Sequence, residues 1–485
     1  MLAAASSGPA TSDDVQYRMG YVWTICVVAA LGGLLFGWDW VVIGGAKPFF
    51  ERYFELTSEA AKGWANSCAL IGCLFGALLA GALSDRFGRK RLLMLSACMF
   101  VVTSIGNGMA TNFTVFVVWR MLGGVAIGLA SNLSPMYIAE VAPAKVRGRL
   151  VAINQLTIVL GILFAQYLNW YIVRDLQQYL DLHHAHDLQQ GATDAIIRSS
   201  WYGQKSWRWM FGLTALPSML FFIGMFFVPE SPRWLAKKGK NDRARAILSR
   251  IGGDAYANNA IADIQSTLVN EVGRVNYRDL LEPRMRKALA LGVILAVLQQ
   301  WCGINVIFNY AEEIFKAAGY DISSVLKNIA WTGSVNLGFT FVALGLVDRR
   351  GRRPLMLFGF ASLAVIYVIM GGCYFTGVKG LPMLLLVLSA IACYSMSLAP
   401  VTWVVISEIF PNRIRGAAMA VAVAALWVAC FILTYTFPIL NAKLGQAGTF
   451  LLYAVVCLLG FVHVFIKLPE TKGKTLEEIE RELVD

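Results

Sequence analysis

One carboxylate and one guanidinium lie inside long apolar runs of this sequence. Asp39 stands between two tryptophans near the far end of a run from Tyr21 to about Gly45, and Arg120 lies in another run. A run of roughly 20 apolar residues can cross a bilayer, and a charge inside it usually has a partner and a function. Few other ionisable groups lie well inside such runs, so we predict that Asp39 pairs with Arg120. A motion that separates the pair would then switch the affinity of the carboxylate for a proton.

Each of these two charges also has a less specific explanation. Asp39 would then be an interfacial residue beside an aromatic belt. Arg120 would be a side chain near a helix end that extends to the interface. The sequence alone leaves both explanations open.

A row of amide side chains is the second polar feature of the apolar runs. Its members are Gln299, Gln300, Asn305 and Asn309 in the seventh run and Asn336 in the eighth. Buried amides are costly in a membrane unless they are paired, so the row predicts a polar cavity, although hydrogen bonds between helices would also explain it. Gln300 and Asn305 lie about 140° apart on an ideal helix. They can face one cavity only if the helix is broken, and Gly303 lies between them.

The sequence contains twelve apolar runs, and these polar side chains lie within them. The chain has 485 residues, of which 57% are hydrophobic and 15% are charged, whereas soluble domains are about 45–50% apolar and about 25% charged. We therefore predict an all-α membrane protein. Its twelve transmembrane helices are expected at residues 21–45, 64–83, 92–110, 113–136, 150–173, 209–228, 288–311, 327–347, 354–375, 382–407, 416–439 and 448–467.

The second half of the chain repeats three landmarks of the first half in the same order. The repeated pairs are Gly81–Lys90 and Gly345–Arg353, Ala139–Gly148 and Ser407–Gly416, and Pro229–Ser231 and Pro469–Thr471. This parallel repeat predicts two pseudo-symmetric six-helix bundles with a substrate site between them, near the middle of the membrane. We place the bundles at 21–228 and 288–468, a small helical linker domain at 229–287, and tails at 1–20 and 469–485.

The net charge of +12 is explained by topology. If successive spans cross the membrane in alternating directions, every second connecting segment lies on the same side as both termini. Most Lys and Arg residues fall in these segments or in the tails. Cytoplasmic segments of membrane proteins are enriched in these residues. We therefore predict that both termini and the linker are cytoplasmic, and we expect no nucleic-acid partner. The polar segment before Arg18 lacks the basic and apolar regions of a removable signal peptide.

Five short motifs occur in order along the chain. They are Asp85-Arg86-x-Gly88-Arg89-Lys90, its copy at 348–353, Pro229–Leu235, Gln299-Gln300-x-x-Gly303-Ile304-Asn305 and Pro469–Gly473. The set resembles the sugar porter family of the major facilitator superfamily, from about residue 20 to 482. Within that family it most resembles the bacterial proton-coupled xylose symporters, through Leu133–Glu140 and Thr436–Pro438. The resemblance implies the major facilitator fold and alternating access.

The resemblance also implies roles for the polar residues of the spans. Asp39 matches the protonatable carboxylate of the family, and Arg120 matches its partner. The amides would bind the hydroxyl groups of a sugar, since an amide supplies a donor and an acceptor together. The resemblance adds Gln155 on the fifth span and Trp403 on the tenth to this sugar site. Trp403 would otherwise be a lipid-facing or core aromatic residue.

Charged residues at the cytoplasmic helix ends have a second implied role. The resemblance implies salt-bridge networks that close the cytoplasmic side in the outward-open state. The residues are Asp85, Arg86, Arg89, Glu140, Arg147 and Glu230 in the first half, and Asp348, Arg349, Arg352, Glu408, Arg415 and Glu470 in the second. Topology alone would explain the basic residues, but it does not call for the carboxylates.

Three positions depart from the family pattern. Asn309 stands where the family usually has the first of two tyrosines, and Leu426 and Cys430 stand where the xylose symporters have a Gln and an Asn. The site thereby loses a phenol and two amides. The sugar preference therefore does not follow from the resemblance.

Together these features predict a proton-coupled importer of a monosaccharide in the inner membrane, with a pentose such as xylose first and a hexose second. A facilitative uniporter of the same fold and a transporter-like sugar sensor are the alternatives. We find no nucleophile–base pair, phosphate loop or metal-ligand set, so we expect no enzyme, no metal and no cofactor. The expected partners are the sugar, the proton and the lipid bilayer, and we expect the protein to act as a monomer.

Overall fold

Every regular element in the described part of the chain is a helix. The computed structural model describes residues 17–183, 190–270, 280, 282–410, 415–472, 474 and 478. The first half contains α1 (Met19–Tyr53), α2 (Glu59–Phe87), α3 (Arg89–Met109), α4 (Phe113–Val141), η1 (Ala144–Val146), α5 (Arg147–Ile172), α6 (Leu176–Leu182), α7 (Gln190–Ser199), η3 (Tyr202–Ser206), α8 (Trp207–Gly212) and α9 (Ala215–Phe227). α10 (Pro232–Lys237) and α11 (Asn241–Asn270) follow. The second half contains α12 (Pro283–Trp301), α13 (Ile304–Asn309), α14 (Ala311–Ala317), α15 (Ile322–Arg350), α16 (Arg352–Thr376), α17 (Leu381–Met396), α18 (Leu398–Ile409) and α19 (Arg415–Lys467).

Eleven helical segments of the described residues are long and apolar enough to span a membrane. The last of them, Ala417–Lys467, holds two predicted spans, because Gly445 interrupts the helix with φ 68° and ψ 174°. This division accounts for the twelve helices that the sequence predicts. The prediction of an all-α, multi-pass membrane protein is confirmed.

The first span is longer than the sequence pattern predicts. α1 continues beyond Gly45 through Lys47 and Pro48 to Tyr53. The charge of Lys47 ends the apolar pattern, but the helix continues because Lys47 is fully buried beside carboxylates. The predicted boundary at Gly45 is therefore wrong.

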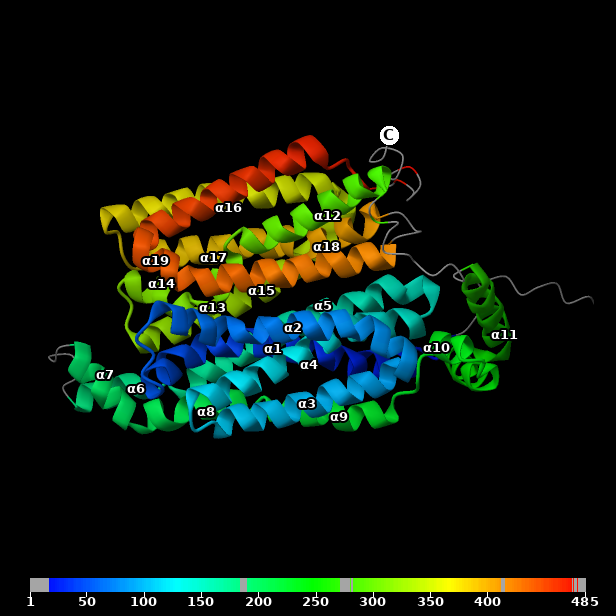
Figure 1. Cartoon of the computed structure of the whole chain (residues 1–485), viewed down its shortest axis with the longest axis horizontal. Helices are drawn as coiled ribbons and strands as arrows, with labels where there is room; N and C mark the ends of the chain where they lie inside the picture. The colour runs from blue at the N-terminus through cyan, green and yellow to red at the C-terminus, as the bar shows by residue number, and fades with distance from the viewer. Residues whose placement is uncertain are drawn as a thin grey trace, which may run out of the picture.

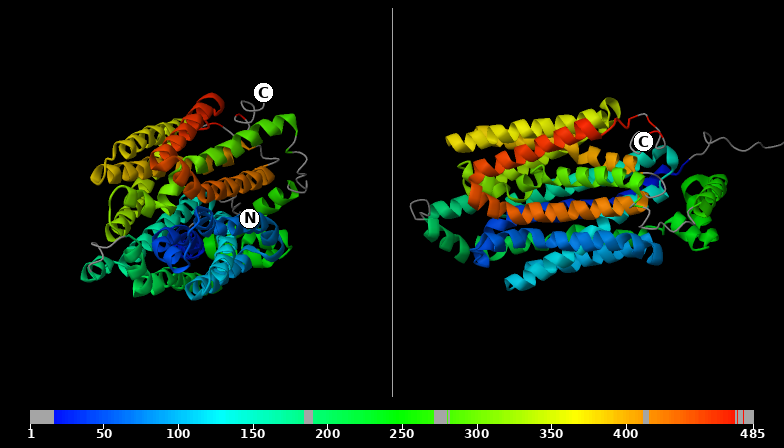
Figure 2. Two further views of the ribbon diagram at one scale, coloured as in Figure 1. Left: turned by 60° about the vertical axis from the view of Figure 1, so that its left-hand side comes forward. Right: turned by 45° about the horizontal axis from the view of Figure 1, so that its top comes forward.

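The helices of the two halves lie side by side as two bundles (Figure 1, Figure 2). α1–α5, α8 and α9 form the N-terminal bundle, and α12–α19 form the C-terminal bundle. α10 and α11 lie at one end of the molecule, which we call the linker end, and α6 and α7 lie at the opposite end (Figure 1). This is the pair of bundles that the sequence repeat predicts.

Glycines let α1 pack directly against the backbone of α5. A Cβ atom at Gly37 would lie 1.9 Å from the carbonyl oxygen of Ile158, and one at Gly161 would lie 2.0 Å from that of Leu34. Small residues allow such close approach of helices in membranes. The contact holds α1, and with it Asp39, firmly within the N-terminal bundle.

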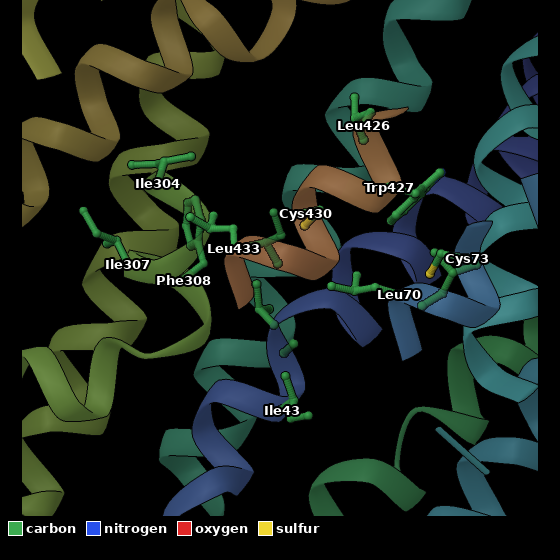
Figure 3. Close-up of a cluster of buried hydrophobic side chains, with 14 of the residues drawn as sticks. Ile43, Leu70, Cys73, Ile304, Ile307, Phe308, Leu426, Trp427, Cys430 and Leu433 are labelled. Atoms are coloured by element: carbon green, nitrogen blue, oxygen red, sulfur yellow. The ribbon is translucent and has the colours of Figure 1, made fainter. Parts of the chain in front are cut away.

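The two bundles meet along a seam. Its helix contacts include α2 with α19, α5 with α15, and α1 with both α13 and α14. Part of the seam is a cluster of apolar side chains, and Figure 3 shows Ile43 of α1, Leu70 and Cys73 of α2, Ile304 and Phe308 of α13, and Cys430 and Leu433 of α19. Apolar contacts are not directional, so two rigid bundles can separate here without breaking hydrogen bonds.

The linker helix packs on the start of the N-terminal bundle. α11 is broken at Gly252 and Gly253, the latter with φ 82°. Ile251 accepts a hydrogen bond of 2.8 Å from the backbone N–H of Arg18. The rings of Tyr17 and Tyr256 pack edge to face, with their centroids 5.4 Å apart. The described part of the linker is therefore folded against the N-terminal bundle and is not a loose tether.

We expect Gly37→Val to lower the midpoint of thermal unfolding of the purified protein, because the added side chain has to displace the backbone of α5. Overpacking of this kind typically costs about 1–3 kcal/mol. Gly338→Ala in α15 is the matched control, since nothing lies within 4 Å of its Cβ position and alanine favours a helix. An unchanged midpoint for Gly37→Val would contradict the backbone contact.

Candidate functional site

Asp39 and Arg120 form a buried ion pair between α1 and α4. Arg120 Nη1 lies 3.0 Å from each carboxylate oxygen of Asp39, and the side chains of Arg120 and Asp39 are 3% and 9% exposed. The guanidinium lies 5.2 Å from the ring centre of Phe211, and its Nε has no hydrogen-bond partner among the described residues. The predicted pair is present, and its role in proton coupling stays a prediction.

A small enclosed cavity of about 10 Å³ lies beside this ion pair. Its lining includes Asp39, Trp40, Asn66 and Arg120 of the N-terminal bundle and Asn309 of the C-terminal bundle. One water molecule needs about 10–15 Å³, so the space beside the pair holds at most one water. Asn309 Oδ1 has no hydrogen-bond partner in the described part of the chain. The ion pair and one predicted sugar-binding amide therefore face the same space.

A chain of hydrogen-bonded amides crosses the break between α12 and α13. Asn305 Nδ2 donates to Gln300 Oε1, and Gln300 Nε2 donates to Gln299 Oε1 at 2.7 Å. Gln299 Nε2 donates in turn to the hydroxyl of Tyr394. Gly303 has φ 85° and ψ −6°, a left-handed conformation that ends one helix before the next begins. The predicted break is confirmed, and it brings Gln300 and Asn305 together.

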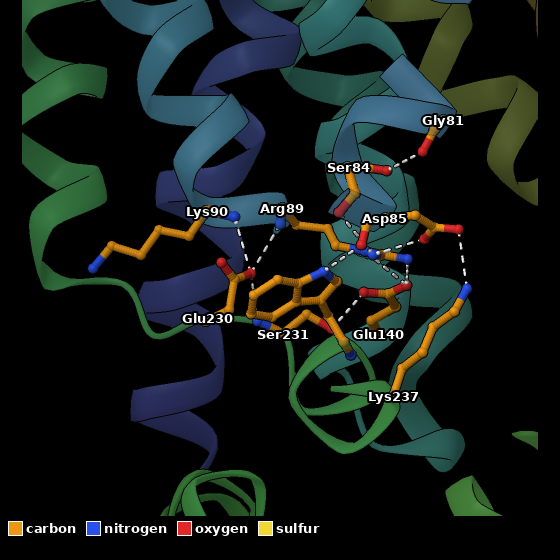
Figure 4. A network of polar contacts seen from close by, with 10 residues as sticks. Gly81, Ser84, Asp85, Arg89, Lys90, Glu140, Glu230, Ser231 and Lys237 are labelled. Carbon is orange, nitrogen blue, oxygen red and sulfur yellow. Dashed lines mark hydrogen bonds and ion pairs between the residues drawn. The ribbon is translucent and has the colours of Figure 1, made fainter. Parts of the chain in front are cut away.

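The charged motif of the first half forms a network at the linker end (Figure 4). Arg89 Nη2 lies 3.0 Å from Glu140, and Arg89 Nη1 lies 3.1 Å from Asp85. Glu230 accepts hydrogen bonds of 3.0 Å from the backbone N–H groups of Arg89 and Lys90. Glu230 thereby caps the N-terminus of α3, where negative charge is favourable. The network braces the ends of α2, α3 and α4 against one another.

The second half repeats this arrangement. Arg352 Nη2 lies 3.2 Å from Glu408. Glu470 accepts the backbone N–H groups of Arg352 at 3.0 Å and Arg353 at 3.1 Å, and Thr471 Oγ1 donates to Glu408 at 2.6 Å. The sequence repeat therefore returns in the structure as the same set of contacts.

Comparison with known proteins assigns this arrangement to a family. A family model described as Sugar (and other) transporter matches residues 25–483. The chain is 36% identical to the D-xylose-proton symporter of Escherichia coli K12 and 36% identical to the Arabinose-proton symporter of Bacillus subtilis 168, with 96% of each chain covered in both cases. An inward open structure of the E. coli xylose transporter matches with a TM-score of 0.80 at 35% identity, covering 96% of this chain and 100% of that one. The chain belongs to the sugar transporter family. It is a membrane transporter of the major facilitator superfamily and not an enzyme.

Besides Asn309, three of the predicted sugar-site residues of the transporter lie outside the chain of amides. Gln155 on α5 is half-buried, and Trp403 on α18 is 40% exposed. No hydrogen bond between described residues joins either of them to the amides. Asn336 Oδ1 accepts a hydrogen bond of 2.7 Å from Ser395 Oγ. This contact between α15 and α17 is of the kind that the sequence left open as the alternative to sugar binding.

Some of the predicted gate residues do not join the networks in this conformation. Arg86, Arg147 and Arg349 are exposed, and none of them forms an ion pair with another described residue. The side chains of Asp348 and Arg415 lie outside the described residues. The ion pairs of the two networks each stay within one half of the transporter. They brace each bundle, and their predicted role as a gate stays a prediction.

An aromatic cluster at the seam is not evident from the sequence. The ring of Trp427 on α19 lies 6.1 Å from those of Phe36 and Trp40 on α1. Trp40 also lines the cavity beside Asp39, so the cluster links this cavity to the C-terminal bundle. The available signal was the spacing of Phe36 and Trp40 by one helical turn, next to Asp39.

Lys47 and its carboxylate partners were also not identified from the sequence. Lys47 is fully buried and hydrogen-bonds to Glu313 on α14. The available signals were a lysine directly after the first apolar run and the adjacent pair Glu312 and Glu313 after the seventh.

We expect Glu230→Ala to destabilise the transporter by about 1–3 kcal/mol, because it leaves backbone donors at the start of α3 unpaired. Glu470→Ala should cost a similar amount, since Glu470 caps α16 in the same way. The measurement is thermal unfolding of the purified protein, with Arg86→Ala as the exposed control. If Glu230→Ala is no more harmful than Arg86→Ala, the network does not brace the bundle.

Proposed function

We propose that the protein is a symporter that imports a monosaccharide together with a proton by alternating access. The observation that carries this proposal is the shared cavity, in which the ion pair of Asp39 and Arg120 meets Asn309 of the other bundle. A proton site and a sugar site that share one space can be coupled by the motion of one rigid bundle against the other. The relatives whose names state xylose-proton and arabinose-proton symport support the same function.

The proton would act through the ion pair. With Asp39 ionised, the pair holds α1 to α4 in a nearly dry site. Protonation of Asp39 would leave the guanidinium of Arg120 buried without a counter-ion, which is strongly unfavourable. A rearrangement that brings water to Arg120 relieves this cost, so proton binding and bundle motion favour one another. A proton shifts the balance of states only through such a difference in affinity between them.

The sugar would bind to the chain of amides. Gln299, Gln300 and Asn305 form its proposed core, and the further members are Gln155, Asn309, Asn336 and Trp403. Each amide offers a donor and an acceptor, which suits the hydroxyl groups of a neutral sugar. In the present conformation the three core amides satisfy one another. A sugar therefore has to replace these mutual hydrogen bonds with its own.

A pentose such as xylose is the first proposed substrate, and a hexose is the second. Leu426 and Cys430 are buried on α19, and Cys430 Sγ lies 3.7 Å from Asn305 Nδ2. A thiol is a weak hydrogen-bond partner and leucine offers none. This wall favours a sugar with fewer hydroxyl groups.

The linker end is proposed to face the cytoplasm of a bacterial cell, with both termini on that side of the inner membrane. Arg89 and Lys90 of the basic motif lie there, close to Lys237 of α10 (Figure 4). Cytoplasmic segments of membrane proteins are rich in Lys and Arg. We propose that a single copy of the chain is the transporting unit, because both halves of the sugar and proton sites come from one chain.

We expect Asp39→Asn to abolish accumulation of the sugar against its gradient while sugar exchange continues, because the variant has no carboxylate to carry the proton. Uptake and counterflow in vesicles with an imposed pH gradient measure the two activities. Asp242→Asn changes an exposed carboxylate of the linker and is the matched control. Accumulation that persists in Asp39→Asn would identify a uniporter in which Asp39 is structural.

We expect xylose to raise the midpoint of thermal unfolding more than glucose or galactose at equal concentration. A ligand that binds only the folded protein stabilises it, by about 2.7 kcal/mol at 100 times its Kd. The mirror-image sugar L-xylose is the control ligand, and Gln300→Ala should lose the effect. A larger shift with a hexose would overturn the pentose preference, and no shift with any sugar would contradict the sugar site.

A further inference from the structure

A fully buried lysine lies at the seam, about two helical turns after Asp39 on α1. Lys47 of α1 is 0% exposed, and its ammonium group hydrogen-bonds to Glu313. Two more carboxylates, Glu51 and Glu312, lie 3.8 Å and 3.9 Å from the same nitrogen. The nitrogen also lies 4.8 Å from the ring centre of Tyr310. A buried ammonium is tolerated only when carboxylates balance its charge.

These contacts join one bundle to the other. Lys47 and Glu51 belong to α1, whereas Glu312 and Glu313 belong to α14. Of the ion pairs between described residues, only Lys47–Glu312 and Lys47–Glu313 connect the two bundles. The cluster lies at the end opposite the linker, since the neighbouring Arg52 pairs with Asp194 of α7.

We propose that Lys47, Glu312 and Glu313 form the outer gate of this transporter, an ion lock that must open before the transporter can face outward. The inference rests on the proposed transport cycle and on its orientation, with the linker end in the cytoplasm. The lock has two favourable states: the charges are paired when the seam is closed and hydrated when it is open. A half-open seam would remove Glu312 and Glu313 from Lys47 before water reaches it and would leave only Glu51 of its own helix beside it, so the gate opens or closes as a unit.

The seam around the lock is closed in this structure. A Cβ atom at Gly44, less than one turn from Lys47, would lie 2.8 Å from the backbone oxygen of Phe308 in the other bundle. Where α5 meets α15 across the seam, Gln166 Nε2 donates a hydrogen bond of 3.2 Å to Thr332.

The lock is attached to the helix that carries sugar-site amides. α14 follows α13 directly, and Tyr310 lies at their junction. The Tyr310 hydroxyl donates to the carbonyl oxygen of Thr434 at 2.6 Å, and its ring lies 4.6 Å from that of Phe437. Because α13 holds Asn305 and Asn309, opening the lock displaces part of the proposed sugar site. The gate and the site are thereby coupled.

None of the neighbouring basic residues described below takes the place of Lys47 in the contact with α14. Arg52 binds Asp194 at 2.8 Å, Lys62 binds Glu59 at 2.8 Å, and Arg198 binds Glu55. All three pairs join residues of the first half of the chain. Lys47 therefore supplies the positive charge of the contact with α14.

Hydrogen exchange measured by mass spectrometry on the full-length transporter, without sugar or a proton gradient, tests the lock. Lys47→Glu places like charges across the seam and should raise the outward-facing population about tenfold or more, as for a broken buried pair. Exchange should then become faster in α14 and at the end of α1, and slower at the linker end. Lys47→Glu combined with Glu313→Lys restores an opposite-charge pair and should return both regions to the wild-type pattern.

Arg52→Gln is the matched control, because it breaks a neighbouring ion pair that does not cross the seam. It should leave exchange at the linker end unchanged. The proposal is overturned if Lys47→Glu has no effect at the linker end, since local loosening alone would speed exchange only near the substitution. It is also overturned if the charge swap fails to restore the pattern. If Lys47→Glu does not fold, Lys47→Met takes its place with the same expectation.

The outcome of the exchange experiment can be distinguished from the outcome of the transport tests. Exchange is measured without any substrate, so a wrong sugar or an uncoupled proton does not alter it. Failure of Asp39→Asn to abolish accumulation would remove the symport proposal and leave the lock in place. Failure of the exchange experiment would remove the lock and leave the symport proposal in place.

Discussion

The cost of charge in an interior without water governs this structure. Asp39, Arg120 and Lys47 are each less than 10% exposed, and each has an opposite charge beside it. The pair of Asp39 and Arg120 lies within one bundle, whereas the contact of Lys47 with Glu313 lies between two bundles. Each pair is favourable when it is dry and closed or when it is separated and hydrated. Such pairs restrict the molecule to a few discrete conformations, which is what alternating access requires.

Motion between these conformations needs stiff bundles and a seam that can open. Stiffness comes from backbone contacts such as Gly37 on Ile158 and from the capping carboxylates Glu230 and Glu470. Many of the contacts at the seam are apolar (Figure 3). Separating apolar surfaces breaks no hydrogen bond. The free-energy cost of opening this part of the seam is therefore spread over many small contacts. The charges at Lys47 then decide when the outer part of the seam is closed.

The amides of the proposed sugar site face a related constraint, because buried polar groups need partners even when no sugar is bound. Gln299, Gln300 and Asn305 hydrogen-bond to one another and so avoid the cost of unpaired buried polar groups. They can do so only because the helix breaks at Gly303, which rotates Asn305 toward Gln300. Among the described residues, Asn309 keeps an oxygen without a hydrogen-bond partner beside the ion pair.

The sequence by itself determined the number of membrane spans and the repeat of two bundles, and it predicted the break at Gly303 and the pairing of Asp39 with Arg120. These follow from apolar length, repeated motifs and the scarcity of intramembrane charge, all of which are visible along the chain. The tertiary structure alone decided that α1 continues through Lys47, because the carboxylate that stabilises Lys47 lies 266 residues away on α14. It also decided that Trp427 meets Phe36 and Trp40, and that Arg147 stays outside the network at the linker end. A local pattern does not record which side chain from another element balances a buried charge, since that balance exists only once the bundles have packed.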